Sequence, residues 1–194
     1  MNGKFLAAVA ALALSAPVLA DSGFYIQGDA GVSKVKASAE GASVSQSGFS
    51  PRLTAGYDFG NNWRVVVDYT HYKSLKVSET YDTETFNSKA KFNSVGVSAI
   101  HDFPVSEKVK PYLGARLGIN RLSFDYQESD PEYDYYETGS FKKTKIGAGV
   151  LAGVGVNVTG KVTLDVGYRY NYWGKFDGTK VQSNELSAGV RVKF

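Results

Sequence analysis

The sequence predicts an all-β fold: an eight-stranded antiparallel up-and-down barrel of the transmembrane type, with four long extracellular loops and three short periplasmic turns. Three observations support this prediction. Apolar and polar residues alternate in eight runs, which is the period of a β-strand. The polar positions of these runs carry charges of both signs in near balance. The connections between the runs alternate between long and short, as they do in bacterial outer-membrane barrels.

Each alternating run predicts one strand, because successive side chains of a strand point to opposite faces. The apolar positions of each run are expected to share one face of the barrel. Run by run, they are Phe24, Ile26, Ala30 and Val32 (24–33), Leu53, Ala55, Tyr57 and Phe59 (52–59), Trp63, Val65, Val67 and Tyr69 (63–70), Val95, Val97, Ala99 and Phe103 (94–103), Leu113, Ala115, Leu117 and Ile119 (112–120), Ile146, Ala148, Val150, Ala152, Val154 and Val156 (145–156), Val162, Leu164, Val166, Tyr168, Tyr170 and Tyr172 (162–172), and Leu186, Ala188, Val190, Val192 and Phe194 (185–194).

The polar face of these strands is predicted to line the interior of a narrow barrel. A soluble β-sandwich would show such a face to water, but here acidic and basic residues nearly balance. That balance suits an enclosed space where an unpaired charge is very costly. The inward glycines leave either water-filled space or room for large side chains such as Arg116 and Arg169. The predicted interior charge network comprises Asp29, Arg52, Asp68, Arg116, Lys145, Asp165, Arg169, Glu185 and Arg191.

The connections place the barrel across a membrane. The long ones span 34–49, 73–91, 122–143 and 174–183, and the short ones 60–62, 104–109 and 157–161. An even number of strands puts both termini in the periplasm and every long connection outside. Aromatic residues are expected at the two lipid boundaries. They are Phe24, Phe59, Trp63, Phe103 and Phe194 on the periplasmic side, and Tyr69, His71, Phe92, Tyr168, Tyr170, Tyr172 and Trp173 on the outer side.

The first 20 residues are predicted to be a cleaved secretory signal peptide, which leaves 21–194 as a single barrel domain. Lys4 precedes the apolar run 5–14, and Val18 and Ala20 provide the small or β-branched positions before a cleavage site. That apolar run is too short for a membrane anchor. The mature chain is therefore expected outside the cytoplasm.

The composition argues against several other classes of protein. The 194 residues carry a formal net charge of only +3 and form no long basic block, so no nucleic-acid partner is expected. The sequence lacks the repeated apolar runs of about 20 residues that a helical membrane protein needs. Its 13 Tyr, 11 Phe and 2 Trp argue against disorder. Because cysteine is absent, neither disulfides nor thiolate metal sites are available.

Five segments resemble the family of Neisserial surface protein A and the opacity proteins, which are small outer-membrane barrels. They are GFSPRLTAGY (48–57), VDYTHYK (67–73), VKPYLGARL (109–117), LDVGYRYNY (164–172) and ELSAGVRVKF (185–194). The resemblance covers nearly all predicted strands and is poor in the long connections. It implies an eight-stranded barrel in the outer membrane of a Gram-negative bacterium. It also implies loops that bind host receptors, glycosaminoglycans or complement regulators, but the divergent loops do not carry over a particular partner.

Catalysis, metal binding and a wide pore are not expected. The two histidines are His71 and His101, and alternation separates His71 from Asp68 on the opposite face. Two separated histidines make a poor transition-metal site, no EF-hand spacing is present for calcium, and no cofactor is predicted. Side chains nearly fill the interior of an eight-stranded barrel, although a small conductance stays open as an alternative.

Adhesion or host-factor binding through the loops is therefore the predicted function, with a purely structural barrel or a narrow porin as the alternative. The segment 127–137 is acidic and rich in tyrosine, which gives large contact area at low entropic cost. Its carboxylates favour a protein partner, on a host cell or in serum, over a polyanion. The barrel is expected to be a monomer. Lys34, Lys36, Lys73, Lys76, Lys91, Arg121 and Lys142 are expected near the outer boundary, as contacts for lipid and lipopolysaccharide phosphates or as solvated charges. The candidate partner-binding residues are Tyr81, Phe86, Tyr126, Tyr133, Tyr135, Tyr136, Lys142 and Lys143.

Overall fold

A computed structural model describes residues 22–39, 42–81, 84–130, 135–176 and 178–194. The predicted signal peptide therefore lies outside the described residues. The strands are β1 (Gly23–Ala39), β2 (Ala42–Phe49), β3 (Arg52–Asp58), β4 (Trp63–Tyr81), β5 (Glu84–Asp102), β6 (Val109–Asp130), β7 (Tyr135–Asn157), β8 (Val162–Phe176) and β9 (Thr179–Lys193). Within the described ranges, no helix is long and apolar enough to cross a membrane.

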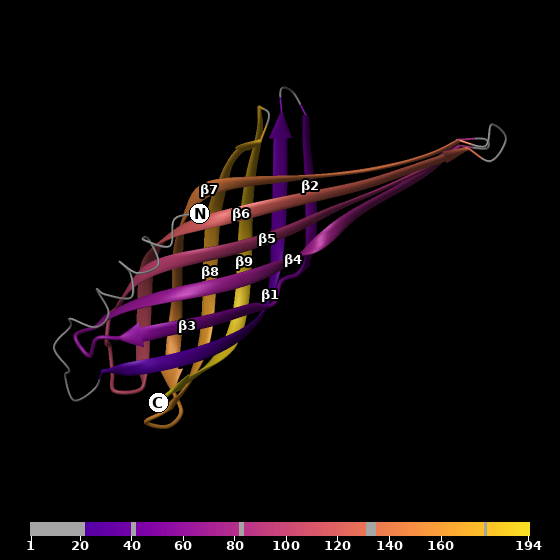
Figure 1. The fold of residues 1–194 in the computed structure, drawn as a ribbon. Coiled ribbons are helices and arrows are strands. Elements are labelled where there is room, and N and C mark those ends of the chain that lie inside the picture. Colours follow the sequence, from indigo (N-terminus) through magenta and orange to yellow (C-terminus); the bar gives the residue numbers. More distant parts are fainter. Residues whose placement is uncertain (1–21, 40–41, 82–83, 131–134, 177) are drawn as a thin grey trace.

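The strands form one closed antiparallel sheet, so the predicted barrel is confirmed (Figure 1). Neighbours in sequence pair around the ring, and β1 closes it by pairing with β9 from Tyr25↔Lys193 to Ser38↔Lys180. β2 and β3 both pair with β1 and together make a single barrel strand. The break between them falls at Ser50 and Pro51, where proline has no N–H to donate to the ladder. The ring therefore contains eight barrel strands.

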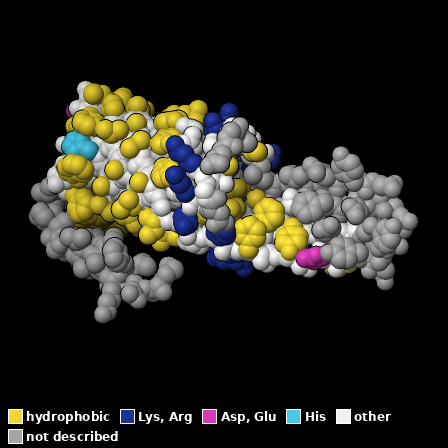
Figure 2. Space-filling model, turned by 90° about the horizontal axis from the view of Figure 1, so that it is seen from above, with side chains coloured by type: hydrophobic (Ala, Val, Ile, Leu, Met, Phe, Trp, Pro, Cys, Tyr) yellow, Lys and Arg dark blue, Asp and Glu magenta, His cyan; other side chains and the backbone are white. Residues whose placement is uncertain are grey.

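The alternation assigns the two faces as predicted. On β1, Phe24, Ile26 and Val32 are exposed, whereas Tyr25 and Asp29 are buried. The same pattern continues on the other strands, and exposed apolar side chains cover the outside (Figure 2). Since the outside is apolar and the charges lie inside, the barrel is built for a lipid surrounding.

The four long connections are not irregular loops, which corrects the prediction for 34–49, 73–91, 122–143 and 174–183. Each is mostly a continuation of its two strands into a hairpin: β1 with β2, β4 with β5, β6 with β7, and β8 with β9. Most of their residues are polar, and the alternating apolar residues that remain, such as Leu122, Phe124 and Tyr126, continue the inward face instead of the lipid face. The short connections lie at the opposite end, as predicted. The turn before β4 contains Gly60 and Asn62, both with positive φ.

Four strands leave the barrel together and form a projecting sheet (Figure 1). β5 pairs with β6 out to Thr85↔Ser129, and β6 with β7 to Asp130↔Tyr135. β8 pairs with β7 only from Ala148 onward, and β3 pairs with β4 only up to Thr70. We call this projecting sheet the extension. Its four strand segments are 73–81, 84–91, 122–130 and 135–145.

Candidate functional site

The barrel interior is filled in three layers. Each layer is marked by one of three inward residues on β4, every second inward position of that strand. Arg64 lies in the periplasmic layer, Asp68 in the middle and Tyr72 at the outer mouth, and each is at most 2% exposed. Ion pairs stabilise the first two layers, and aromatic packing closes the third.

The middle layer is centred on Asp68. Its carboxylate accepts hydrogen bonds from Arg116 Nε at 2.9 Å, Arg116 Nη2 at 2.8 Å and Arg169 Nη1 at 3.0 Å. Arg52 pairs with Asp29 at 3.1 Å and with Glu185 at 3.5 Å. These contacts join six different strands across the interior, and they neutralise buried charges that would be very costly alone.

The periplasmic layer contains two further ion pairs. Arg64 forms a bidentate pair with Asp102 at 2.7 Å for both bonds, and Arg191 donates to Asp165 at 3.0 Å. Tyr112 also donates to Asp165 at 2.7 Å. The Arg64–Asp102 pair is missing from the predicted network. The sequence does indicate this pair, because alternation places both residues at inward positions of their strands.

One predicted member of the network lies elsewhere. Lys145 is exposed on β7, so its inclusion in the interior was wrong. The ladder between β7 and β8 begins at Ala148↔Tyr172, three residues nearer the periplasm. Lys145 therefore lies beyond the closed ring, where the inward face of β7 meets solvent.

The inward glycines make room for the large interior side chains. A Cβ added at Gly96 or Gly118 would overlap the Arg116 guanidinium, and one added at Gly153 would overlap the Tyr112 hydroxyl. The space beside each of these glycines is therefore occupied by a neighbouring side chain and not by water.

An aromatic cluster closes the outer mouth. Tyr72 and Trp173 are fully buried with ring centroids 4.9 Å apart, and Phe92 lies 5.9 Å from Trp173. Trp173 Nε1 donates to Ser183 Oγ at 3.0 Å. The placement of Phe92 and Trp173 at the outer lipid boundary was therefore wrong. Each lies one position off the outward series of its strand, so its ring points inside.

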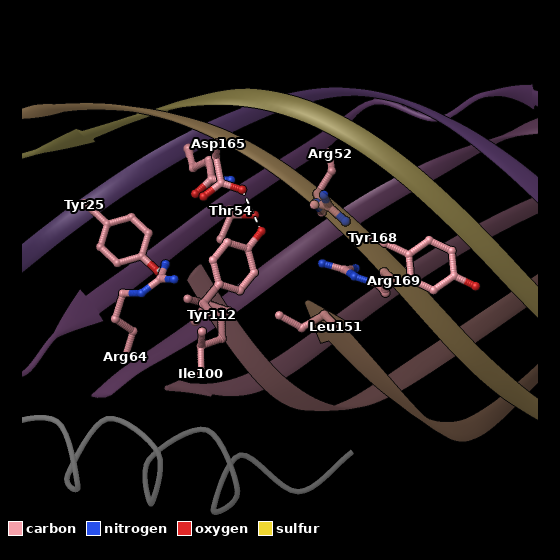
Figure 3. Close-up of a pocket in the computed structure, with 13 residues that line it drawn as sticks. Tyr25, Arg52, Thr54, Arg64, Ile100, Tyr112, Leu151, Asp165, Tyr168 and Arg169 are labelled. Carbon is pink, nitrogen blue, oxygen red and sulfur yellow. Dashed lines mark hydrogen bonds between the residues drawn. The ribbon is translucent and has the colours of Figure 1, made fainter. Parts of the chain in front are cut away.

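Little space is left below this cluster. Among the described residues, a cavity of about 40 Å³ lies between the periplasmic and middle layers, lined in part by Arg52, Arg64, Tyr112 and Arg169 (Figure 3). That volume holds a few water molecules. Because the aromatic cluster lies above it, this arrangement does not favour the narrow-porin alternative.

The histidines are not arranged for catalysis. His71 is exposed on the outer face, and its Nδ1 lies 2.7 Å from Asn93 Oδ1, whereas Asp68 is buried inside. His101 lies near the periplasmic end, with its ring 4.7 Å from Trp63 and 4.6 Å from Phe103. Among the described residues, no group of three or more His, Cys, Asp or Glu is placed to hold a metal ion.

The extension carries an aromatic surface on the face that continues the barrel interior. The rings of Phe124 and Phe141 stack at 5.1 Å, and Tyr126 lies 6.5 Å from Phe124. Lys143 Nζ is 5.5 Å from the Phe141 ring centroid. Phe141 is 43% exposed. We call these four residues the inner aromatic surface.

The structure divides the predicted partner-binding residues between two faces of the extension. Tyr126 and Lys143 belong to the inner aromatic surface, whereas alternation places Tyr136, 66% exposed, and Lys142 on the outer face. The side chains of Tyr81, Phe86, Tyr133 and Tyr135 lie outside the described residues. Phe124 and Phe141 are missing from the predicted set, although both lie in the predicted third loop.

A belt of cations lies on the outer face where the extension begins (Figure 2). Alternation points the following side chains outward: Lys34 and Lys36 of β1, Lys89 and Lys91 of β5, Arg121 of β6, Lys142 of β7, Lys175 of β8 and Lys180 of β9. Asp125 of β6 lies beside Lys91, which donates to it at 2.9 Å. This hydrogen bond lowers the pKa of the Asp125 carboxyl below its ordinary value.

These features define an outer-membrane β-barrel protein of the bacterial surface, with a closely packed interior and an extension outside. A family model described as "Opacity family porin protein" matches residues 55–194. The chain belongs to the opacity family, so the resemblance predicted from its strands is confirmed. Since opacity-family barrels are surface proteins and not enzymes, the chain is an outer-membrane protein without a catalytic role.

Individual relatives agree with this assignment. Opacity protein opA55 of Neisseria gonorrhoeae is 34% identical over 184 residues, covering 74% of this chain and 77% of the relative. The crystal structure of Neisserial surface protein A is 44% identical with a TM-score of 0.63, covering 89% of this chain and 99% of that one. The attachment invasion locus protein Ail of Yersinia pestis shares the fold at 22% identity, with a TM-score of 0.61 and coverage of 87% and 99%.

Proposed function

We propose that this protein is an adhesin whose extension binds a host protein on cells or in serum. The inner aromatic surface is the observation that carries the proposal. It places Phe124, Tyr126 and Phe141 together on one face of the extension, with Lys143 over the Phe141 ring. Aromatic side chains beside a cation are typical of residues that dominate binding energy at protein interfaces.

The rest of the fold supports rigid display of this surface. β1–β9 pairing closes the sheet without a second copy, which favours a monomer. The ladders of β4 to β7 continue unbroken from the barrel into the extension, apart from one register shift between Tyr72 and Leu75. A preordered surface loses less entropy on binding than a disordered loop does.

The test compares bacteria that lack other adhesins and display the intact chain or the double variant Tyr126→Ser with Phe141→Ser. We expect the double variant to lose at least about tenfold in adherence to epithelial cells or in retention of a serum protein. Phe103→Ser is the matched control, because Phe103 is 48% exposed at the periplasmic end. Surface labelling and the gel mobility of unheated samples check assembly.

Unchanged binding by a correctly assembled double variant would overturn the proposal. If neither the intact chain nor the variants adhere, the structural-barrel alternative gains support. Conductance across planar bilayers is then the next measurement, because the narrow porin differs from the structural barrel only there.

We further propose that the signal peptide is removed during export by cleavage after Ala20. The support is the basic start, the apolar run and the residues Val18 and Ala20 of the sequence. N-terminal sequencing of the protein from outer membranes should begin at Asp21. A start at Met1 would contradict this proposal without touching the barrel.

A further inference from the structure

The outer face changes abruptly from apolar to cationic on three neighbouring strands. Val95, Ile119 and Ile146 pair across β5, β6 and β7 in one row, and they are 46%, 43% and 77% exposed. Four residues farther out on β5 and β7, the outward positions are Lys91 and Lys142. At about 3.4 Å per residue, this change occurs within about 14 Å. Such a step marks where acyl chains give way to headgroups.

Three basic residues flank Ser123 on the outer face just above this step. Ser123 of β6 pairs with Lys91 of β5 on one side and with Lys142 of β7 on the other. Neighbouring strands are about 4.8 Å apart, so the two lysines lie on strands about 10 Å apart. Arg121 lies two residues before Ser123 on the same face of β6, about 7 Å away. We call these four residues the rim cluster.

The charge of the rim cluster exceeds that of its acidic neighbour. Asp125 offsets one cation through its 2.9 Å contact with Lys91. Arg121 and Lys142 are both exposed. Arg121 can bind a phosphate through two parallel N–H donors, and a lysine adds a point charge. The Ser123 hydroxyl can donate a further hydrogen bond.

We infer that the rim cluster binds a phosphate group of lipopolysaccharide in the outer leaflet. The position of the rim cluster along the barrel axis, just outside the apolar row, indicates the class of ligand. A phosphate on the sugar headgroup lies level with Arg121, while the acyl chains of the same molecule cover Val95, Ile119 and Ile146. A soluble phosphate would use only the charges, and a lipid without phosphate only the apolar row.

The test uses the full-length mature chain refolded in detergent micelles, with lipid adducts measured by native mass spectrometry. The probes are bisphosphorylated lipid A, the same lipid without phosphates, and inorganic phosphate as a competitor. The variant K91Q/R121Q/K142Q removes the cations of the rim cluster. The matched control K108Q/K110Q/K161Q removes the same number of charges at the periplasmic end, outside the cluster.

We expect the rim-cluster variant to lose at least about tenfold in affinity for bisphosphorylated lipid A, since each basic residue near an anionic surface contributes several-fold. The control variant should lose much less, and the lipid without phosphates should bind both proteins equally weakly. Equal losses in the two variants would show a general charge effect and overturn the inference. Full competition by millimolar inorganic phosphate would also overturn it, because the site would then recognise free anions and not lipid. Unheated gel mobility verifies that both variants are folded.

Discussion

Replacing Asp68 with Asn should destabilise the barrel by about 3 to 5 kcal/mol, the cost of breaking a buried ion pair from one side. Asp68 is 1% exposed and receives three hydrogen bonds from Arg116 and Arg169. The amide keeps the volume of the carboxylate but loses its charge, and its NH₂ group faces a guanidinium. Two buried arginines then share the remaining carboxylates of the interior.

The assay is urea unfolding of protein refolded into lipid vesicles, followed by the fluorescence of Trp63 and Trp173. Asp58→Asn is the matched control. Asp58 pairs with Lys193 at 3.2 Å, but the two side chains are 22% and 24% exposed. Water screens such a pair, so we expect the control to lose less than about 1 kcal/mol.

A double-mutant cycle with Arg116→Gln separates the ion pair from other effects. If the two residues stabilise each other, Asp68→Asn should cost less in the Arg116→Gln background than in the original chain. The reasoning is refuted if Asp68→Asn costs no more than Asp58→Asn. It is also refuted if the cost is the same in both backgrounds, because Asp68 would then act without Arg116.

Three further substitutions test other parts of the barrel. Val150→Arg should make insertion into vesicles less favourable by about 2 to 4 kcal/mol, because Val150 is 55% exposed on the lipid face. Normal insertion would mean that the faces are reversed. Gly118→Val should cost about 1 to 3 kcal/mol in urea unfolding through overlap with Arg116, whereas Gly28→Val has open space and should cost little. Trp173→Ala should lower the free energy of unfolding by about 3 to 5 kcal/mol. If this ring seals the mouth, planar-bilayer recordings of the variant should also show new conductance.

The sequence predicts the membrane-spanning part well, because a strand between lipid and a polar interior must alternate. Val150 outward and Asp68 inward follow from that period alone. The pairing of particular charges does not follow from this period. Whether Arg116 meets Asp68 or Glu185 depends on the stagger between strands, which is a property of the closed ring.

The extension shows where sequence patterns fail. Outside the membrane both faces of a strand meet water, so alternation is no longer required and the segment 122–143 resembles a loop. Ladders to neighbouring strands set its register instead. Phe124 and Phe141 pair across β6 and β7, and this pairing becomes visible only when the register is known.

In the extension, alternation gives one sheet two surfaces, for which we propose different partners. Phe141 and Lys143 point to the face that continues the barrel interior, whereas Lys142, between them in sequence, points to the face that continues the lipid surface. The two proposals can therefore be separated on one strand. Losses of host binding in Phe141→Ser and of lipid A binding in K91Q/R121Q/K142Q should occur independently. If each variant impaired both activities, the extension would act as a single site, and its two faces would not be the units of recognition.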